Sequence, residues 1–514
     1  MAKFQHGTSY KEMPSGLKIF AETQTPTVIV GTGTINMGDM SCVNKPILIQ
    51  NSKDAATYFG GANNIKGFTI NEALYLAFNV YNVKPIIVIN VLNPSEHKTA
   101  HTEQDIVVKD FKATLEKIGI INDENLIVKN GETSTLIAKE KYSCSFDNEG
   151  KLIITLAKTE TSIKKLEVSY NFLDVSKLKE TDVIGSIDPQ TLEAKGLECL
   201  KEIFPKYSMI PSCVVAPDFS TAKIRVALDA KSAVINDKWA SMSIPEMPNT
   251  TKYGEVIAFK KEKNYIDGKK EGKVLETFES MIQMKANYKY LKKEKNYIDA
   301  DQAITWGCPY LEDKVFHFST VMALHMQSVD AQFDGVPCES PSNKNIKMQG
   351  VGYYEGATFK RVNLDEAEAN LLNENGISTI IRQPNGTVFW GNRTSVFQPG
   401  GETDPKDVWI PVKRMFKYIG NTIMLNNTVE VDKGMTPSQA KSIETNINVW
   451  LNSLTNDNKL LGGRVEFKPE ENSEQDMIAG KFKWHIYLGA IIPGESLEFR
   501  LEYDSKYLKL LFQR

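Results

Sequence analysis

The chain has 514 residues, too many for one ordinary hydrophobic core, so we expect two to four domains. Its 61 basic and 64 acidic side chains leave a formal net charge of −3, which argues against a nucleic-acid-binding protein because such proteins need a basic face. The longest apolar run, Pro85 to Leu92, is far shorter than a membrane span, and the polar first residues predict no signal peptide.

The first part of the chain predicts an arm followed by an α/β layer. Residues 1–16 contain glycine and proline but few large apolar groups, which is typical of an extended arm. A short buried strand is expected at Thr27–Gly31, and a helix after Thr69, where Thr69 and Glu72 have the spacing of a capping box. The continuous apolar run at Pro85–Leu92 indicates a strand that is covered on both faces.

The sequence changes character after Pro94. Short segments such as Leu152–Leu156 and Leu166–Tyr170 are separated by polar turns rich in Lys, Glu and Thr, which predicts a largely β insertion over residues 94–189. The α/β pattern then returns in helix-like Gln190–Phe204, strand-like Ser212–Ala216 and the segment Phe219–Ile235.

A Lys-rich region contains the octapeptide KKEKNYID twice, at Lys260–Asp267 and Lys292–Asp299. Two copies are fewer than the three or more units that a solenoid needs. The charge pattern favours a local duplication within a solvated excursion.

A hairpin and a small α+β region are predicted near the end of the chain. Two strands, Ile377–Arg382 and Thr387–Trp390, flank the turn residues Pro384, Asn385 and Gly386. Further on, Thr436, Pro437 and Gln439 stand in the order of an N-cap, a first-turn proline and a capping-box glutamine. The helix that follows should bury one face, made of Ala440, Ile443, Ile447, Trp450 and Leu454. Strands are expected around Val465 and Phe467 and at Phe482–Leu488.

The last segment, Ser496–Asp504, alternates strictly between apolar and charged side chains. One face carries Leu497, Phe499, Leu501 and Tyr503. This period of two predicts a half-buried strand, and no hairpin partner follows Pro493. Such a strand must pair with its own sheet or add to the sheet of another molecule.

The sequence offers no candidate catalytic, cofactor-binding or metal site. The Gly31-Thr32-Gly33 turn lacks the third glycine of a dinucleotide loop, since position 36 is Asn36, and a flexible turn is favoured. No phosphate-binding P-loop and no nucleophile elbow occur. The six cysteines show no CxxC spacing, so neither a zinc site nor a disulfide scaffold is indicated, and synthesis in a reducing compartment fits best.

Four histidines are weighed as metal ligands. His97 and His101 have i,i+4 spacing but lie in a polar loop without a third ligand, which favours surface histidines. His317 and His325 flank an apolar stretch and are interpreted as partner-bonded core or interface groups.

Several blocks, in this order, resemble contractile tail sheath proteins of tailed phages and related injection machines. The blocks are Thr25–Gly61, the segment Val329–Gly335 with Pro337 and Pro341-Ser342-Asn343, the hairpin Asn375–Ser395, Leu461-Gly462-Gly463, Asn472–Gly480 and Pro493–Phe499. The resemblance covers roughly 1–93 and 190–514. It departs from the family before Asp330, where the family's arginine is not matched, and over 250–300, which has no counterpart.

The resemblance implies a non-enzymatic structural subunit without cofactors. Sheath subunits form hexameric rings stacked around a tail tube, and contraction drives the tube through the envelope of the target cell. The implied partners are other copies of the chain, the tail tube protein, and baseplate and tail-terminator proteins, with no direct contact to nucleic acid and no membrane insertion. The implied place is the tail of a virion, or a phage-tail-like particle, assembled in the cytoplasm of the bacterial host.

The resemblance also assigns expected roles to residues. The two chain ends, about 1–16 and 496–508, should leave the subunit and complete a sheet on neighbouring copies by strand exchange. The residues expected to exchange are Phe4, His6, Thr8, Tyr10, Leu497, Phe499, Leu501 and Tyr503. The family-motif residues with structural roles are Asp330, Gly335, Gly376, Trp390, Gly391, Arg393, Thr394, Gly462, Gly463, Gly480, Pro493 and Glu495.

The expected fold class is multi-domain α/β and α+β, with a discontinuous core, a mainly β insertion and two extended arms. The expected division is an N-terminal arm (1–16), an α/β sheath core (17–93 plus 190–360), a β-rich outer insertion (94–189), a C-terminal α+β domain (361–495) and a C-terminal strand or arm (496–514).

Three alternatives remain open at this stage. The particle could be a headless bacteriocin-like device instead of a phage tail. A non-contractile or adhesive lattice protein of an envelope would share the terminal strand, but should carry a secretion signal. An α/β enzyme would use the Gly31 turn for phosphate and should bind nucleotide tightly.

Overall fold

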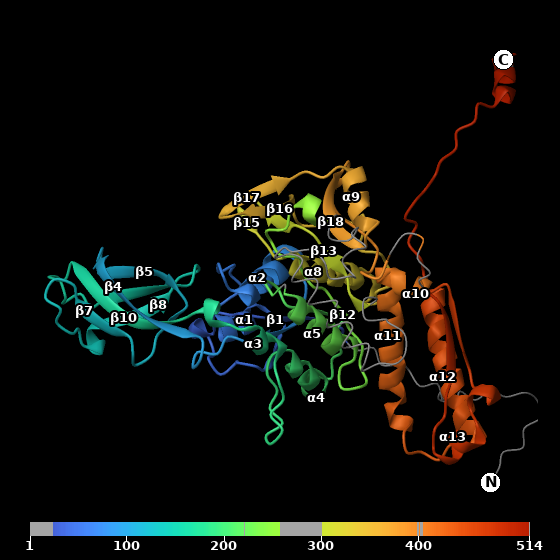
Figure 1. The fold of residues 1–514 in the computed structure, drawn as a ribbon, viewed down its shortest axis with the longest axis horizontal. Helices are drawn as coiled ribbons and strands as arrows, with labels where there is room; N and C mark the ends of the chain where they lie inside the picture. Colours follow the sequence, from blue (N-terminus) through green and yellow to red (C-terminus); the bar gives the residue numbers. More distant parts are fainter. Residues whose placement is uncertain (1–23, 220, 257–300, 398–399, 401–403, 513–514) are drawn as a thin grey trace, which may run out of the picture.

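The computed structural model describes residues 24–219, 221–256, 301–397, 400 and 404–512. The described elements form an elongated molecule, with a β-rich unit at one end, an α/β core in the middle and a helical unit at the other end (Figure 1). The expected N-terminal exchange residues Phe4, His6, Thr8 and Tyr10, and both KKEKNYID copies, lie outside the described residues.

The core is built on a five-stranded sheet. Its order is β12-β11-β1-β3-β2, where only β2 is antiparallel to its neighbour. The strands are β1 (Thr27–Gly31), β2 (Pro46–Ile49), β3 (Ile86–Asn90), β11 (Cys213–Val215) and β12 (Met242–Ser243). The strands expected at Thr27–Gly31, Pro85–Leu92 and Ser212–Ala216 are confirmed.

Both faces of this sheet are covered, because successive side chains of a strand point to opposite sides. Val28 and Val30 of β1 belong to one hydrophobic cluster, while Ile29 belongs to another. All three are fully buried. The continuous apolar runs of the central strands are therefore explained, as expected for parallel strands between two helical layers.

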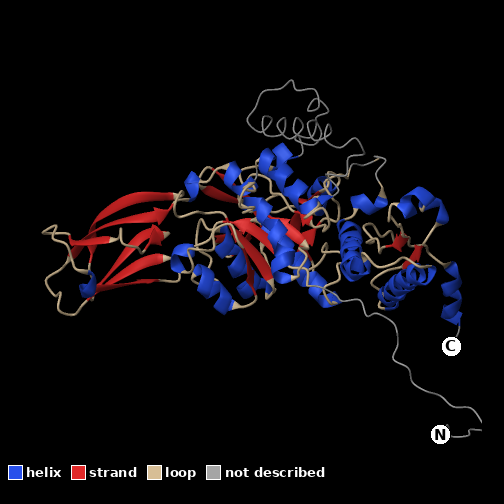
Figure 2. Ribbon diagram, turned by 90° about the horizontal axis from the view of Figure 1, so that it is seen from below, coloured by secondary structure: helices blue, strands red, loops and turns tan. Residues whose placement is uncertain are grey.

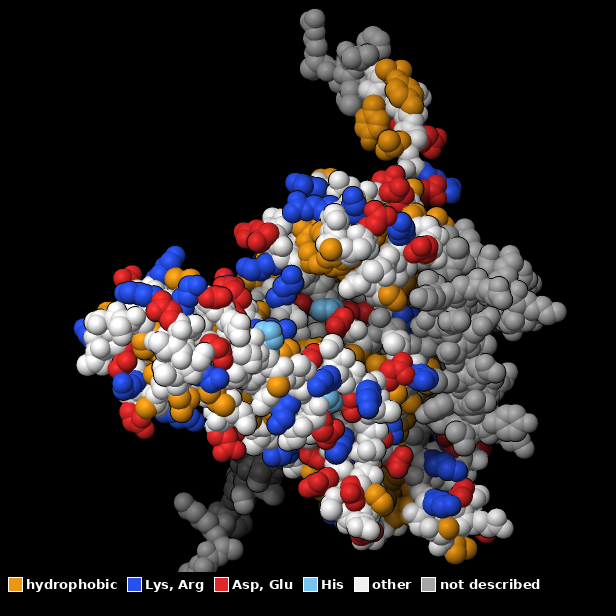
Figure 3. All heavy atoms as spheres, turned by 60° about the vertical axis from the view of Figure 1, so that its left-hand side comes forward, with side chains coloured by type: hydrophobic (Ala, Val, Ile, Leu, Met, Phe, Trp, Pro, Cys, Tyr) orange, Lys and Arg blue, Asp and Glu red, His pale blue; other side chains and the backbone are white. Residues whose placement is uncertain are grey.

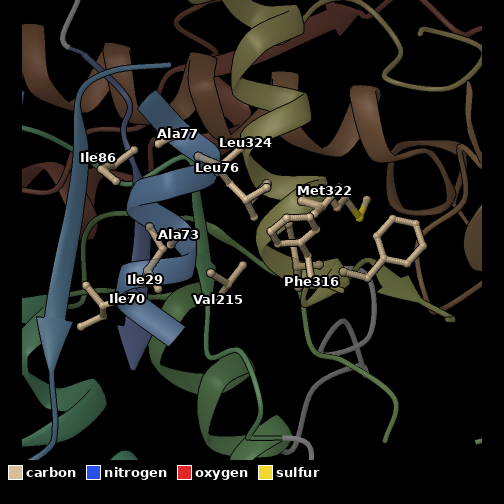
Figure 4. Packing of buried hydrophobic residues seen from close by; sticks show 14 of the residues in the cluster. Ile29, Ile70, Ala73, Leu76, Ala77, Ile86, Val215, Phe316, Met322 and Leu324 are labelled. Atoms are coloured by element: carbon tan, nitrogen blue, oxygen red, sulfur yellow. The ribbon is translucent and has the colours of Figure 1, made fainter. Parts of the chain in front are cut away.

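The helices of the core divide between the two faces of the sheet. On one face lie α1 (Ser52–Phe59), α2 (Thr69–Tyr75), its π-helical continuation η2 (Leu76–Tyr81) and α8 (Phe318–Asp330). Figure 4 shows Ile70, Ala73 and Leu76 packed between Ile29 of the sheet and Leu324 of α8. On the other face lie α3 (Glu180–Ile184), the 3-10 helix η5 (Gly196–Glu202), α4 (Ile203–Tyr207) and α5 (Ala222–Ala233).

Two local predictions in the core were wrong. The helix at Thr69 has no capping box: its N-cap is Phe68, and the Glu72 side chain accepts a hydrogen bond from the His317 amide at 2.7 Å instead. The segment Gln190–Phe204 is not one helix, because Gly196 takes the left-handed φ of 58° and a helix begins only there. In both places a distant contact or a glycine overrides local spacing.

Two small sheets extend the core. The first contains β13 (Ile304–Thr305), β18 (Ile377–Gln383) and β19 (Gly386–Trp390), and the second contains β14 (Cys308–Leu311), β15 (Lys314–Val315), β16 (Gly350–Glu355) and β17 (Thr358–Val362). The hairpin predicted around the Pro384 turn is confirmed as β18 and β19, and α9 (Glu366–Asn373) packs on it. Ile377, Ile380 and Phe389 of this hairpin join the main core cluster, although the sequence division assigns them to the C-terminal region.

The β-rich unit has its own hydrophobic cluster. Its strands are β4 (Lys98–Val107), β5 (Lys112–Ile118), β6 (Ile120–Ile121), β7 (Ile127–Asn130), β8 (Tyr142–Phe146), β9 (Lys151–Leu156) and β10 (Lys165–Leu173). They form two sheets, which stand out at one end of the molecule in Figure 2. The unit begins and ends on paired residues, since Lys98 lies opposite Leu173. Helix α3 already belongs to the core, where Val183 is buried.

The helical unit at the other end is formed by α10 (Pro405–Val408), α11 (Ile410–Asn427), α12 (Pro437–Asn456), β20 (Gly462–Glu466), α13 (Glu474–Ile478) and β21 (His485–Gly489). The predicted stripe of α12 is confirmed as its buried face. Thr436 caps this helix by accepting from the Gln439 amide, but the Gln439 side chain donates to Glu430, so only half of the predicted capping box forms.

Candidate functional site: an open sheet edge and an uncovered chain end

The last sheet of the chain consists of β20 and β21, paired antiparallel with Val465 opposite Ile486. The side chain of Asn448, on α12, accepts from the Val465 amide at 2.9 Å and donates to the Val465 carbonyl at 3.2 Å. It therefore covers part of the outer edge of β20. β21 has no second neighbour among the described strands, and a two-stranded sheet is marginal in water. Its free edge can accept another strand.

An apolar groove of about 720 Å³ lies between α11, α12 and β21. Trp484 and Ile486 of the β21 segment form one wall, and Ile443, Ile447 and Ile423 of the two helices form the others. If a strand were added beside β21, its apolar side chains could pack in this groove. A second groove, of about 350 Å³, adjoins the start of α12 and shares Phe482 with the first.

The terminal segment Ser496–Asp504 is extended and pairs with none of the described strands. The apolar face predicted from the sequence is almost fully exposed: Leu497 by 73%, Phe499 by 85%, Leu501 by 99% and Tyr503 by 78%. Figures 1 and 3 show the chain end leaving the body, with apolar side chains uncovered. A short 3-10 helix, η11 (Ser505–Phe512), follows. The alternative in which this strand pairs with its own sheet is not found in the structure.

Residues from separate sequence blocks meet where this arm begins. Arg393, just past the end of β19, holds both oxygens of the Glu495 carboxylate with one edge of its guanidinium: Nη2 donates to Oε2, and Nε lies 3.0 Å from Oε1. The Arg393 guanidinium carbon lies 3.5 Å from the centre of the Trp409 ring and 4.1 Å from that of Phe397. Sequence spacing could not reveal this contact, because the two charged residues are 102 positions apart.

The other motif residues stabilise the frame around the hairpin. Gly376 has a φ of 65°, and a Cβ there would lie 2.5 Å from the Thr394 carbonyl oxygen. The Thr394 hydroxyl donates to the Asp407 carbonyl at 2.5 Å, and Trp390 Nε1 donates to Asn370 at 2.9 Å. Gly335, Gly391 and Gly480 also have positive φ, Gly462 and Gly463 open β20, and Pro493 precedes the arm.

Asp330 forms a buried ion pair that joins the core to the helical unit. Arg414 of α11 donates to both of its carboxylate oxygens, one at 3.0 Å, and to the Ser212 hydroxyl at 2.9 Å. Burial raises the pKa of Asp330, and the Arg414 charge opposes that rise. The partner of the family-motif residue Asp330 is thus Arg414.

The turn at Gly31 is occupied by its own neighbours. The Thr32 amide donates to Thr69 Oγ1 at 3.0 Å, and the Gly33 amide donates to Asn90 Oδ1 at 3.0 Å. A Cβ on Gly31 would lie 2.2 Å from the same Thr69 oxygen. Since a phosphate site needs free backbone amides, this geometry favours the packed turn over a nucleotide loop.

His317 and His325 are partner-bonded, as the sequence indicated. His317 Nδ1 lies 3.0 Å from Glu72 Oε2, and its Nε2 lies 3.7 Å from Asp218. Burial alone lowers the pKa of His317, but the charges of Glu72 and Glu246 and the hydrogen bonds raise it well above 6.5. Buried His325 donates to the Pro341 carbonyl, and burial lowers its pKa to about 4.

His97 corrects the expectation of a surface histidine, since it is 5% exposed. Its Nδ1 accepts from the Asn93 amide at 2.9 Å, and its Nε2 lies 3.3 Å from Asp182. With Glu96 these residues make the one cluster of potential metal ligands in the described part of the chain, but both ring nitrogens are already engaged. His101 is exposed and packs against the Tyr170 ring.

All six cysteines are free thiols in the structure. None of the described helices is long and apolar enough to cross a membrane. The polar groups described above have hydrogen-bond or ionic partners within the chain. Among the described residues, the outer edge of β21 has no neighbouring strand, and the apolar side chains of the arm are exposed. This pair of features is the candidate functional site.

The chain is similar in sequence to tail sheath proteins of phages. No model of a protein family matches it. The tail sheath protein of Burkholderia phage BcepMu is 23% identical over 516 residues, which cover 99% of each chain. The chain is thus similar to this phage tail sheath protein over almost its whole length. The tail sheath protein of Escherichia phage P2 is 27% identical over 164 residues, which cover 32% of this chain and 40% of the sheath protein.

Two solved structures share the fold. A chain from the anti-feeding prophage baseplate superposes with a TM-score of 0.53 at 14% identity, covering 98% of this chain and 100% of its own. A chain from the contracted sheath of an extracellular contractile injection system gives a TM-score of 0.51 at 13% identity, covering 98% and 99%. The sheath resemblance drawn from the sequence blocks is confirmed.

Proposed function

We propose that the chain is the structural subunit of a contractile tail sheath in a phage tail or a phage-tail-like injection particle. It polymerises as stacked hexameric rings around a tail tube, between baseplate and terminator proteins, and contracts to drive the tube through the target envelope. One observation carries this proposal: the same chain has an exposed apolar segment, Ser496–Asp504, and a sheet in which the outer edge of β21 is unpaired among the described strands. Similarity to one phage tail sheath protein over 99% of the chain supports it.

Strand exchange explains how a sleeve can shorten and stay whole. A strand added to β21 keeps its main-chain hydrogen bonds while the subunit bodies rotate, whereas a flat side-chain interface would have to slide. Burial of Phe499 and Leu501 in a neighbour contributes about 1.5–3 kcal/mol for each side chain, offset in part by ordering the arm. The same gain recurs at every subunit of the lattice.

Contraction in this scheme consumes no nucleotide. The extended lattice stores the energy as a metastable state, and ring-to-ring contacts become more extensive after shortening. The internal bonding of the Gly31 turn is consistent with a device that does not bind nucleotide.

The β-rich unit lies at the opposite end of the molecule from the helical unit and the arm (Figure 1). We therefore assign it to the outer surface of the sleeve. Because Lys98 and Leu173 are paired neighbours, residues 99–172 can be excised and the ends joined by a short linker. Such a chain should still assemble, and loss of assembly with an intact core would contradict the peripheral role.

Two variants test the assembly proposal, one on the apolar face of the terminal strand and one on its charged face. Replacing Phe499 and Leu501 by Asp should leave folded subunits that no longer polymerise, because the apolar face can no longer be buried. The matched control replaces Glu498 and Glu502, on the opposite face, by Gln and should polymerise normally. Deleting residues 1–16 should also abolish polymerisation. Electron microscopy should show sleeves with sixfold symmetry for the parent and control chains, and sleeves of normal length from the Asp variant would refute the proposal.

A further inference from the structure

Glu495 is the last residue of the described chain that forms a hydrogen bond with the body of the subunit. After β21 the chain passes the helical unit, where Ala490 packs against Val408, Trp409 and Val412. Glu495 then binds Arg393. Beyond Glu495, each hydrogen bond recorded for the described residues joins two residues of the arm itself, such as Arg500 with Glu498.

Arg393 is fixed by the segment Val408–Trp409 and by two aromatic rings. Its backbone bridges to Trp409, and the next residue donates its amide to the Val408 carbonyl at 3.0 Å. The guanidinium stacks on Trp409 and Phe397, which leaves the Arg393 side chain 15% exposed. A planar fork held in this way binds both oxygens of a carboxylate, and little freedom is lost when Glu495 docks.

The surroundings leave room for the arm base to move if this contact opens. Residues 493–497 form one wall of a polar cavity of about 800 Å³, and the opposite walls include Glu366 and Asn370 of α9. Without the ion pair, the free segment would begin after Ala490, which packs on the helical unit, instead of at Ser496. The tether would lengthen by five residues, from 491 to 495, and a longer tether lowers the effective concentration of the strand at its target.

We propose that the Arg393–Glu495 pair, clamped by Trp409 and Phe397, is the fixed root of the C-terminal arm. It confines bending to residues 496–504 and sets the direction in which the strand leaves the core for a second copy of this chain. This inference rests on the proposed strand exchange for its purpose, but the clamp itself acts within one subunit. Arg393 and Glu495 are positioning residues, because they do not contact the neighbouring sheet in this scheme.

The test measures the clamp and the assembly separately in the full-length chain. Limited proteolysis of the unassembled subunit fraction, with the cut sites identified by mass spectrometry, should cleave residues 491–495 at least tenfold faster in Glu495→Gln than in the parent, because this segment is then no longer held at Glu495. The matched control, Glu498→Gln, removes an arm carboxylate whose partner Arg500 is exposed and should leave these rates unchanged. Arg393→Lys keeps the charge but loses the fork, and should give an intermediate rate.

The assembled particles supply the second measurement. Sleeves of Glu495→Gln should form more slowly than sleeves of the control and show a wider spread of ring-to-ring rotation in electron micrographs. Unchanged cleavage at 491–495 in both Glu495→Gln and Arg393→Lys would overturn the clamp, whatever the variants do in assembly. Faster cleavage with sleeves identical to the control would overturn its role in directing the arm. Failure of strand exchange itself would appear separately, as normal assembly of the Asp variant of Phe499 and Leu501.

Discussion

The core and the C-terminal sheet of this protein satisfy their polar and apolar groups in different ways. In the core, the central strands are covered on both faces, and amides at the Gly31 turn bond to side chains of the same chain. In the C-terminal unit, β21 has a free edge beside an apolar groove, while the matching apolar strand extends away from the body. With the strand exchange that we propose, the core is complete in one chain and the C-terminal unit is completed by a neighbouring chain.

Breaking the Asp330–Arg414 pair should give the largest loss of stability in a single subunit. Asp330→Ala leaves the Arg414 charge buried without its carboxylate, a change that typically costs about 3–5 kcal/mol. Asp334→Ala, four residues further on, removes a carboxylate that is 82% exposed and should shift the unfolding midpoint in urea very little. Equal midpoints for the two variants would show that the core does not depend on its internal pairs.

Gly391 and Gly480 differ in how much space a side chain would have. Gly391, with a φ of 144°, has Ser378 Oγ at 2.4 Å from the position of a Cβ, whereas Gly480, with a φ of 74°, has no atom within 4 Å. Gly480→Ala should therefore cost only the backbone penalty of about 1–2 kcal/mol, and Gly391→Ala should cost about 1–3 kcal/mol more. Thermal unfolding of both variants measures the difference, and a larger loss for Gly480→Ala would contradict it.

The two histidines should give pH-dependent effects of opposite sign, each small per pH unit. The pKa of His325 falls from 6.5 to about 4 on folding, so stability is lost as the pH drops from 6.5 towards 4, by up to about 1.4 kcal/mol per pH unit. The pKa of His317 rises on folding, so its contribution is complete below pH 6.5 and is lost as the pH rises through the higher folded value.

Urea unfolding across pH checks this assignment in two variants. His325→Gln should flatten the acid side of the stability profile, and His317→Gln should flatten the alkaline side. A profile that keeps its shape in both variants would show that other groups control the pH dependence.

Much of the fold follows from the sequence, because local patterns specify it. The buried strands β1 and β3, the hairpin β18–β19 and the buried stripe of α12 each have a clear period, a turn signal or a cap. Contacts between distant residues could not be found in this way. His97 looked like a surface residue because its partner Asp182 lies 85 positions away, and Arg393 and Glu495 stood in separate motifs.

The functional site shows the same division. The alternating side chains of Ser496–Asp504 predict a strand, but only the structure shows that its apolar face is uncovered and that β21 has a free edge. Neither the groove between α11 and α12 nor the clamp at Arg393 has a sequence signal, because each is built from segments that meet only in the folded chain.

A near-atomic electron microscopy structure of the assembled particle tests the central claim most directly. We expect the free edge of β21 in each subunit to carry a strand from another subunit, joined by main-chain hydrogen bonds, with the apolar face of that strand in the groove between α11 and α12. Arms folded back onto their own subunits, or sleeves in which the edge of β21 stays bare, would contradict the account.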